Sequence, residues 1–533
     1  MKRVRTTKVI IALICLMLLV LFACDNEQEE SFTEITITSP ASEAIVDHMV
    51  RITAAVLDSV NVTQVEFYLD GDSLATITDR PYVIDWNTEI VLNGTHKIYC
   101  KAYDISGNVA KSDEIRVTVK NFLFSARFTD NWVETYSNLG VIYVSDMEGN
   151  LLKEALFHGD EKFELAQTPS MGALPDRISV TVLYYGYSMP EAITYFDIPR
   201  GSYWTFNSEK RYSFGNQYQV EFSFSNEPEH NGFLISNKWT GYCGLGGTGL
   251  IESYTLSFRA LPARCFISYL SGESGASYLW VNDITEDHYD VDLTSLEMMT
   301  PAKIELGEVL HECRLSLFGF SDPGNHYTED YWLNLDYSST TGIDSVTVYY
   351  LPDEFSDYHT EIWSYHDWFS EKWVQETYGD IPVTFSRIDA DFTITSSTID
   401  DFAIETTGSC DVIKSDWYDY ENSNYWDCYS PSDITQYALP EPGPVALQRF
   451  PDLEMDNYEL RNVTLIEHSQ LSSYEEMIEI QFNSSDLFFN IVNDIRTRIK
   501  YTDEYRNRQI EEGIDPHKQR ERYYDQVRER LRD

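Results

Sequence analysis

Apolar residues along this chain alternate with polar ones over many short runs, which is the pattern of half-buried β-strands. The clearest runs lie between residues 34 and 120, where turn signals separate them at regular intervals. Apolar rows that face one way are Val50, Ile52, Ala54 and Val56; Val65, Phe67 and Leu69; Ile98, Cys100 and Ala102; and Ile115, Val117 and Val119. Asp70-Gly71 marks a tight hairpin, because glycine accepts a positive φ. The pattern predicts a sandwich of roughly seven strands.

Several motifs in the same region resemble a known family. They are Val65-Glu-Phe-Tyr-Leu-Asp-Gly-Asp72, Arg80-Pro-Tyr-Val-Ile-Asp-Trp86, Asn93-Gly-Thr-His96, Ala102-Tyr-Asp104 and Gly107-Asn108. Together they resemble the bacterial Ig-like repeats of secreted glycoside hydrolases and cell-surface proteins. The resemblance implies an immunoglobulin-like domain at residues 34–120 that serves as a spacer or a binding platform. Cys100 lies where antibody domains form their inter-sheet disulfide, but its expected opposite residue is Ala54, so we predict a core thiol.

The same alternation continues through most of the remaining chain and predicts a mainly β protein built of tandem β-sandwich modules. We expect a β-sandwich module at 121–210, which loosely resembles transthyretin-like accessory domains, and β-rich modules at 219–306 and 307–483. No long linker marks their boundaries.

The pattern changes in residues 484–533, for which we predict a charged helical tail. Ser485 is placed to cap a helix whose face carries Leu487, Ile491, Ile495 and Ile499 at i, i+4 spacing. From Asp494 onward 11 basic residues nearly balance 10 acidic ones. One interpretation is a basic contact surface for a partner or for the protein's own acidic body. The other is a solvated helix with internal ion pairs.

The N-terminus has the features of an export signal. Basic residues precede an apolar run from Val9 to Phe22, which as a helix spans roughly 21 Å, less than the ~30 Å hydrocarbon core. Leu21-Phe22-Ala23-Cys24 resembles the lipobox of bacterial lipoproteins. The resemblance implies a signal peptide at 1–23, an acyl chain such as palmitate on Cys24, and an acidic tether at 24–33. We therefore expect a lipoprotein of the cell envelope, held in the outer membrane and facing the cell surface or the periplasm.

The charge of the chain limits its partners. The sequence has 87 acidic and 39 basic residues, so its formal net charge is −48. Removing residues 1–23 takes away four positive charges and leaves about −52. Such a field repels nucleic acid and anionic lipid headgroups, and it attracts cations and basic partners. We therefore predict no nucleic-acid partner.

Export permits disulfides among the cysteines that remain after signal cleavage and lipidation. Cys410 and Cys428 flank one aromatic loop, and Cys243 and Cys265 flank a predicted hairpin, so these are two candidate pairs. Buried free thiols are the alternative, because connectivity does not follow from sequence.

Two short segments resemble catalytic or cofactor-binding motifs, but the residues around them do not fit those motifs. Gly244-Leu-Gly-Gly-Thr-Gly249 matches a dinucleotide-binding fingerprint, but a strand pattern follows it instead of a helix. His311-Glu312 begins like a zinc-protease motif, yet Leu315 stands where the second histidine is required. We predict no catalytic residues and no metal site. Asp416, Asp419 and Glu421 are a weak candidate for Ca²⁺, which needs six to eight oxygen ligands.

Two aromatic-acidic segments are the candidate binding surfaces. Their residues are Trp363, Trp368 and Trp373 in the first segment, and Trp417, Tyr420 and Trp426 in the second. Exposed rings stack on sugars while carboxylates accept hydrogen bonds from hydroxyls, but the same rings also fill cores. We favour a non-enzymatic binding or adhesion platform for a polysaccharide or protein partner. An exported hydrolase with its site in 219–483, and a structural envelope subunit that docks through the C-terminal helices, are the alternatives.

Overall fold

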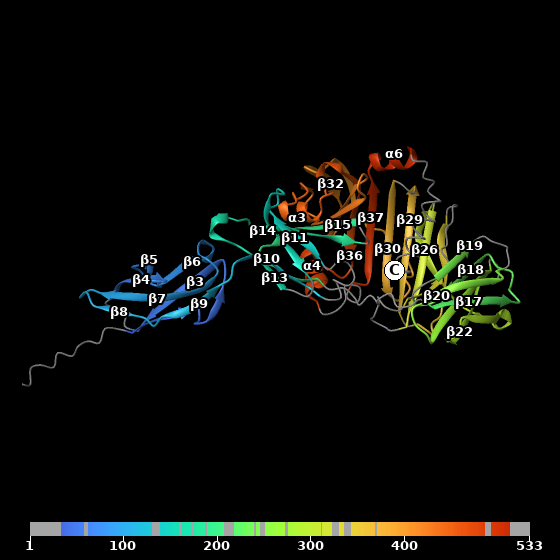
Figure 1. Ribbon diagram of the computed structural model, residues 1–533, viewed down its shortest axis with the longest axis horizontal. Helices are drawn as coiled ribbons and strands as arrows, with labels where there is room; N and C mark the ends of the chain where they lie inside the picture. The colour runs from blue at the N-terminus through green and yellow to red at the C-terminus, as the bar shows by residue number, and fades with distance from the viewer. Residues whose placement is uncertain are drawn as a thin grey trace, which may run out of the picture. The chain divides into compact units, whose positions relative to one another are not determined.

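The computed structural model is mainly β, with few helices, which confirms the predicted fold class (Figure 1). It describes residues 34–57, 62–129, 139–158, 162–172, 174–186, 189–206, 218–238, 241–245, 251–271, 275–310, 312–321, 330–334, 343–355, 357–367, 370–484 and 492–511. Cys24 and the whole predicted signal and tether lie outside this part. The chain divides into two compact units: one reaches Leu123 and includes Ala166–Leu174, and the other holds Phe124–Leu165 and the chain from Pro175 onward.

The first unit contains the predicted immunoglobulin-like sandwich. Its strands are β1 (Ile35–Ser39), β2 (Ala44–Val46), β3 (Met49–Val56), β4 (Val62–Leu69), β5 (Asp72–Ile77), β6 (Val83–Asn87), β7 (Gly94–Asp104), β8 (Val109–Lys111) and β9 (Ile115–Val119). One sheet has the order β1-β3-β6, and the other has the order β2-β9-β7-β4-β5, with β8 beside β7.

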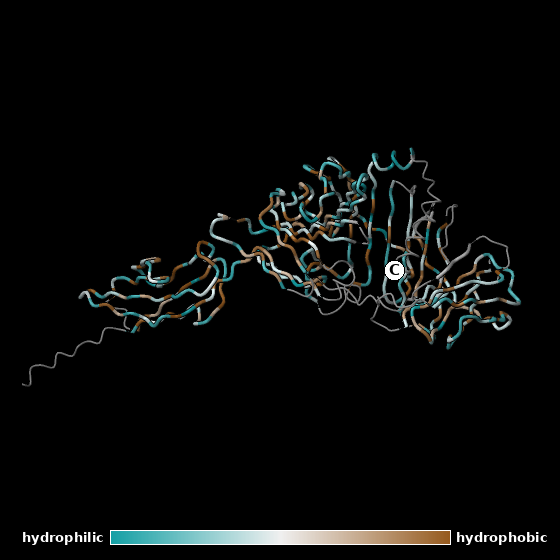
Figure 2. Tube along the Cα trace, viewed as in Figure 1, coloured by the Kyte–Doolittle hydropathy of each residue, from teal (hydrophilic) through white to brown (hydrophobic). Residues whose placement is uncertain are grey.

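The alternation read from the sequence forms the core of this sandwich. The predicted inward rows all belong to one buried cluster, which includes Trp86, or pack against it. Figure 2 shows hydrophobic and hydrophilic residues following one another along the chain. Asp70 and Gly71 both have positive φ, at 54° and 99°, and they turn β4 into β5 as expected. Cys100 is a fully buried free thiol, which confirms its predicted role.

The second unit is organised by a sheet of twelve strands. In spatial order they are β12 (Leu151–His158), β11 (Leu139–Ser145), β14 (Arg177–Gly186), β15 (Met189–Pro199), β34 (Asn424–Pro431), β33 (Val412–Asp419), β36 (Tyr458–His468), β37 (Asp494–Tyr501), β30 (Glu371–Gly379), β29 (Asp357–Asp367), β26 (Glu312–Phe320) and β27 (Asp330–Asn334). Neighbouring strands of this sheet pair antiparallel except β15 and β34, which run parallel.

This sheet contradicts the prediction that 121–210 and 307–483 form separate modules. The parallel pair aligns Glu191 with Tyr425 and Tyr195 with Tyr429, so hydrogen bonds of one sheet cross between the two segments. The local pattern reports that a strand exists and which residues share a face, but it does not report a partner more than two hundred residues away.

The predicted C-terminal helix is wrong over residues 494–501, which form β37 between β36 and β30. A spacing of four puts Ile495 and Ile499 on one face of a helix, but four is also even and puts them on one face of a strand. Because Arg496, Arg498 and Lys500 occupy every second position, the polar pattern of this segment repeats every two residues, as in a strand. Arg498 Nε donates to Glu371 at 2.6 Å, and Lys500 Nζ donates to Asp391 at 2.5 Å. The basic residues of this segment thus contact the protein's own acidic body, one of the two interpretations of its charge.

The remaining elements complete the second unit, and many belong to small sheets packed on the large one. The strands are β10 (Phe122–Phe128), β13 (Lys162–Ala166), β16 (Tyr203–Phe206), β17 (Tyr218–Ser225), β18 (Gly232–Ser236), β19 (Gly241–Leu245), β20 (Ser253–Phe258), β21 (Ala263–Ser271), β22 (Gly275–Ile284), β23 (His288–Asp292), β24 (Glu297–Met298), β25 (Thr300–Leu310), β28 (Ile343–Tyr350), β31 (Asp391–Thr398), β32 (Asp401–Thr407) and β35 (Gln436–Tyr437). Sheets β20-β17-β23 and β19-β18-β21-β22-β24 enclose one core within residues 218–298.

The described helices are short. The α-helices are α3 (Pro444–Arg449), α4 (Tyr474–Asn483) and α6 (Asp503–Glu511), and the 3₁₀ turns are Thr88–Ile90, Pro169–Met171, Leu293–Ser295 and Met455–Asn457. None of the helices in the described part of the chain has the length and apolar character that crossing a membrane requires.

The candidate disulfides are not formed: Cys265, Cys410 and Cys428 are free thiols. Cys428 on β34 is paired with Ser415 on β33. Ser415 is five residues along the chain from Cys410, and five extended residues span roughly 16 Å. A disulfide needs Cα atoms within about 7 Å. Cys243 on β19 and Cys265 on β21 are separated by β18, because the sheet order is β19-β18-β21. The sequence shows that Cys243 and Cys265 flank a hairpin, but it does not show that β18 lies between their strands in the sheet.

Candidate binding site

The hairpin β33–β34 buries the two tryptophans that were expected to form a binding surface. Trp417 is 1% exposed and Trp426 is 0% exposed, and both belong to the largest core cluster. Their indole N–H groups are satisfied inside the protein: Trp417 donates to Ser415 at 2.7 Å and Trp426 donates to Thr194 at 2.8 Å. Neither ring offers a face to a ligand, so the predicted role of these two residues is wrong.

The other candidate rings are occupied by cations. Trp373 lies between the guanidinium groups of Arg387 and Arg498, at 4.2 Å and 5.2 Å from its ring centroid. Tyr420 lies under Arg508 at 4.0 Å. Trp363 is half-buried, with the Lys372 ammonium 5.9 Å from its ring. Trp368 is outside the described residues. The structure thus does not bring the six predicted aromatic residues together on one surface.

A partly buried ion cluster occupies the polar face of the same hairpin. Asp416 and Asp427 are register partners on β33 and β34, and Lys414 Nζ lies 2.8 Å from the first carboxylate and 2.9 Å from the second. Burial, and then the charge of Asp416, raise the pKa of Asp427 to about 7 against the opposing effect of Lys414. Burial would also raise the pKa of Asp416, but Lys414 and further hydrogen bonds outweigh it and lower that pKa to about 2.

This cluster is arranged for structure rather than for hydrolysis. Glycosidases hold their two carboxyl groups roughly 5–10 Å apart so that substrate and water fit between them. Asp416 and Asp427 instead interact with each other and share Lys414. A lysine beside two partly buried carboxylates offsets the cost of removing their charge from water.

The oxygen ligands considered for Ca²⁺ are used elsewhere. Asp416 is bound to Lys414, and Asp419 accepts hydrogen bonds from the backbone of Glu421 and Asn422. Asp416 and Asp419 are three residues apart on β33, so their carboxylates point to opposite faces of the sheet. Within the described ranges, no group of three His, Cys, Asp or Glu side chains is arranged to hold a metal ion.

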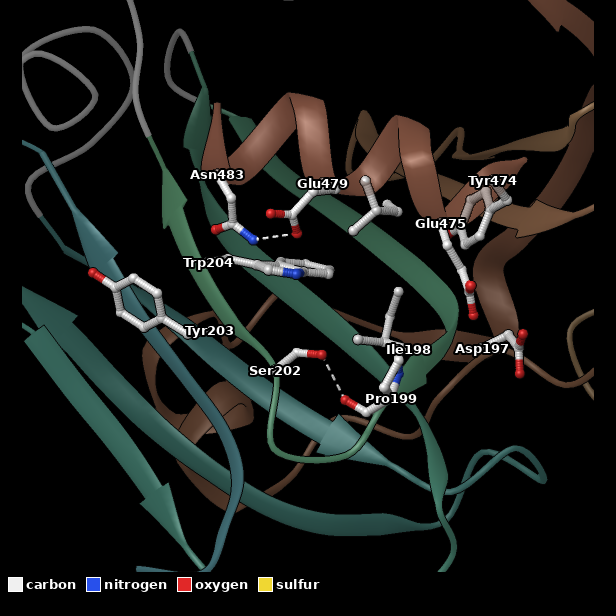
Figure 3. Close-up of a pocket in the computed structure, with 11 residues that line it drawn as sticks. Asp197, Ile198, Pro199, Ser202, Tyr203, Trp204, Tyr474, Glu475, Glu479 and Asn483 are labelled. Atoms are coloured by element: carbon white, nitrogen blue, oxygen red, sulfur yellow. Dashed lines mark hydrogen bonds between the residues drawn. The ribbon is translucent and has the colours of Figure 1, made fainter. Parts of the chain in front are cut away.

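A surface groove lies between α4 and the β15–β16 connection (Figure 3). Its volume is about 290 Å³. It is lined by Asp197, Ile198, Pro199, Ser202, Tyr203, Trp204, Tyr474, Glu475, Ile478, Glu479 and Asn483. We call it the α4 groove.

Local sequence fixes the helical wall of the α4 groove. Ser473 caps α4, since its hydroxyl accepts from the backbone N–H of Glu476 at 3.2 Å. The Glu476 carboxylate in turn accepts from the backbone N–H of Ser472 at 2.8 Å, so the two side chains close the first turn. Glu475 and Glu479 then lie one turn apart on the exposed side.

A tight turn forms the opposite wall. Pro199 ends β15, Gly201 takes a φ of 88°, and the Ser202 hydroxyl donates to the Pro199 carbonyl at 2.6 Å. The chain then enters β16, where alternation exposes Tyr203 and buries Trp204. Tyr203 is 39% exposed and Trp204 is 1% exposed.

The floor of the groove is apolar and rigid. The Trp204 ring stacks on Phe482 of α4 with centroids 4.2 Å apart and planes 5° apart. Tyr195 meets both rings edge-on. Because Trp204 is covered on all sides, it fixes the floor and does not itself stack on a ligand. The Tyr203 ring lies beside the groove, on the opposite face of β16 from Trp204, and in Figure 3 it points away from the cavity.

The rim is acidic. Arg177 forms a two-pronged pair with Asp197, at 2.8 Å and 2.5 Å, and reaches Glu475 at 2.9 Å. These contacts, the Asp197 hydrogen bond first, raise the pKa of Arg177 above its ordinary value. Glu479 accepts from the Asn483 amide at 2.8 Å, as drawn in Figure 3. An aromatic ring beside several hydrogen-bond acceptors suits a polyhydroxylated ligand.

Sequence reasoning missed the α4 groove because its walls come from residues 197–204 and 474–483. The aromatic pair Tyr203-Trp204 after Pro199 and the Ser-Tyr-Glu-Glu cap were visible signals, but neither points to the other. Their proximity depends on the parallel pairing of β15 with β34.

The fold and the groove define a modular, mainly β protein with an immunoglobulin-like domain and a separate surface groove. Residues 34–99 match the family model described as Bacterial Ig domain. No curated protein matches the chain.

Solved structures give only distant matches. Fibronectin(III)-like modules of CbhA from Clostridium thermocellum are 24% identical over 16% of this chain and 94% of theirs, with a TM-score of 0.14. The SGBP-B protein of the mixed-linkage glucan utilization locus of Bacteroides ovatus, solved with a mixed-linkage heptasaccharide, is 12% identical over 60% of this chain and 93% of its own, with a TM-score of 0.14. A tetra-tandem repeat from the extending region of a large adhesion protein is 11% identical over 66% and 97%, with a TM-score of 0.13. Similarities this distant carry no argument about function.

Proposed function

We propose that this protein is a non-enzymatic binding protein of the bacterial cell envelope that holds a polysaccharide in the α4 groove. The observation that carries the proposal is the groove itself: several carboxylate and amide acceptors lie above an apolar floor, and the exposed Tyr203 ring lies beside the groove. Binding pockets for small ligands combine apolar walls with a few polar groups in this way.

The location in the cell envelope is supported by two features. Bacterial Ig domains such as residues 34–99 resemble modules of secreted and surface proteins. The basic N-terminus, the short apolar run and the Leu-Phe-Ala-Cys24 motif suit export and lipidation. We further propose that acyl chains on Cys24 hold the protein in the outer membrane, with the Ig domain acting as a spacer.

Glycan binding is tested by titrating the mature protein with a panel of oligosaccharides and measuring the heat of binding. We expect Tyr203→Ala to weaken binding about tenfold, since stacking contacts of one ring are worth roughly 1–2 kcal/mol. Tyr218→Ala is the matched control, because Tyr218 is 45% exposed on β17, away from the groove. Absence of binding by every glycan, or equal losses in both variants, would refute the proposal.

The lipid anchor is tested by mass spectrometry of the protein purified from membranes. We expect the chain to begin at an acylated Cys24 and Cys24→Ala to release the protein from the membrane fraction. A chain that keeps Met1, or an unmodified Cys24, would contradict the anchor without affecting the groove.

One of the two alternatives, a subunit that docks through the C-terminal helices, cannot be tested by deleting residues 484–533. That deletion removes β37 from the interior of the twelve-stranded sheet and leaves β30 and β36 without their shared neighbour. Loss of a partner would then report unfolding.

A further inference from the structure

The rim of the α4 groove carries more negative than positive charge. Its lining carboxylates are Asp197, Glu475 and Glu479, and no basic residue lines the cavity. Arg177 is a cation that touches the lining, and it serves two of the three carboxylates at once. Glu479 accepts a hydrogen bond from the neutral amide of Asn483.

A further described cation, Lys162, does not change this balance. The Lys162 ammonium lies 5.2 Å from the Tyr203 ring centroid, but it also pairs with Glu164 at 3.2 Å. Counting Glu164 and Lys162 with the rim therefore leaves an excess of two negative charges.

From this charge balance we infer that the α4 groove selects uncharged saccharides and rejects saccharides that carry carboxylate, sulfate or phosphate groups. The inference rests on the proposed function and names the ligand class for the same site. The carboxylates accept hydrogen bonds from hydroxyl groups of a neutral sugar. An anionic sugar placed over the same acceptors meets no cation among the described residues that line the groove, and the carboxylates repel it.

Arg177 has a positioning role in this selectivity. Because it is already bound by Asp197 on two nitrogens and by Glu475, its guanidinium is directed at the rim carboxylates rather than into the cavity. The arginine that elsewhere recognises an anionic sugar is therefore used here to hold two acceptors in place.

The test compares matched ligands that share one backbone and differ only in charge. Suitable pairs are hydroxyethyl cellulose with carboxymethyl cellulose, and methyl-esterified polygalacturonate with its free-acid form, titrated at about 50 mM salt, where surface charges are least screened. For any pair whose neutral member binds, we expect the anionic member to bind at least roughly tenfold more weakly. Equal or tighter binding of the anionic member would overturn the inference.

A double variant tests whether the rim carboxylates cause the discrimination against anionic saccharides. Glu475→Gln together with Glu479→Gln keeps the shape of both side chains and removes two charges. We expect the discrimination within each pair to shrink about tenfold, while the neutral ligand keeps most of its affinity. The control is Glu286→Gln with Glu405→Gln, which removes two charges from exposed positions outside the groove.

The outcomes separate the two proposals. If neutral glycans bind through Tyr203 but anionic ones bind as well, glycan binding stands and the charge selectivity fails. If the control variant reduces discrimination as much as the rim variant, the net charge of the protein is the cause and the rim assignment fails. If no glycan binds, both proposals fail.

Discussion

The β33–β34 hairpin and the α4 groove are both rich in aromatic and acidic residues, yet the structure uses them in opposite ways. In the hairpin, Trp417 and Trp426 fill a core and the acidic residues are bound to Lys414. In the groove, one tryptophan forms the floor, and Tyr203 and Glu479 remain at the surface. The density of aromatic residues is thus no guide to a binding surface.

What separates the two regions is the partner of each polar atom. Both hairpin indoles donate to hydroxyls of the sheet, one of them on a strand far away in sequence, so their rings are enclosed. Tyr203 lies on the short strand β16, whose alternation leaves every second side chain outside. A ring is available to a ligand when its neighbours in space leave one face open, which depends on strand pairing.

The largest expected difference between the two regions is in stability. Trp426→Ala removes a fully buried ring and leaves the Thr194 hydroxyl without its donor, so we expect a loss of about 3–5 kcal/mol in the free energy of unfolding. Chemical denaturation measures it. Trp426→Phe keeps most of the volume and should cost less. A loss below about 1 kcal/mol would show that the hairpin does not belong to the core.

The ion cluster of the hairpin predicts a pH dependence. The pKa of Asp427 is raised from 3.8 to about 7, so its contribution to stability is complete below about pH 4 and is lost as the pH rises through 7. We expect the stability of Asp427→Asn relative to wild type to increase by about 2 kcal/mol between pH 5 and pH 8.

Comparing Asp427→Asn with wild type at each pH cancels the contributions of groups that titrate in both proteins. The pKa of Glu376 is raised to about 8 by burial and by Glu361, and the pKa of Lys372 is lowered to about 7 by burial and nearby arginines. A relative stability that does not change with pH would contradict the proton held by Asp427.

A smaller effect is expected from the rim of the groove. Arg177→Met removes a half-exposed cation from Asp197 and Glu475, so we expect a loss of about 1 kcal/mol in the free energy of unfolding. The neutral-glycan affinity should fall as well, because the acceptors lose their support. If affinity is unchanged while stability falls, Arg177 supports the fold and does not position the rim.

The smallest effect on stability is expected at the ring assigned to binding. Tyr203→Ala should change the free energy of unfolding by less than about 0.5 kcal/mol, because surface side chains contribute little. A loss comparable to that of Trp426→Ala would mean that Tyr203 is a core residue and would remove the contrast between the two regions.

The sequence predicted the Ig domain well because the evidence there is local. Each inward row is a run of alternating residues, and the Asp70-Gly71 turn needs only its own two φ angles. The same reasoning placed Cys100 in the core.

The second unit was harder for a physical reason. The pairings of β15 with β34 and of β30 with β37 join segments more than a hundred residues apart, and hydrophobic periodicity does not encode partners. The error at residues 494–501 came from a spacing that fits both a helix and a strand. The groove was out of reach because it exists only after both segments are placed by the sheet.

The central claim is that a ligand occupies the α4 groove and not the β33–β34 hairpin. Hydrogen–deuterium exchange of the mature protein, with and without a saturating neutral glycan that it binds, tests this directly. We expect the glycan to slow exchange in residues 197–204 and 474–483 and to leave residues 412–431 unchanged. Protection confined to 412–431, or no change in the two segments of the groove, would contradict the account.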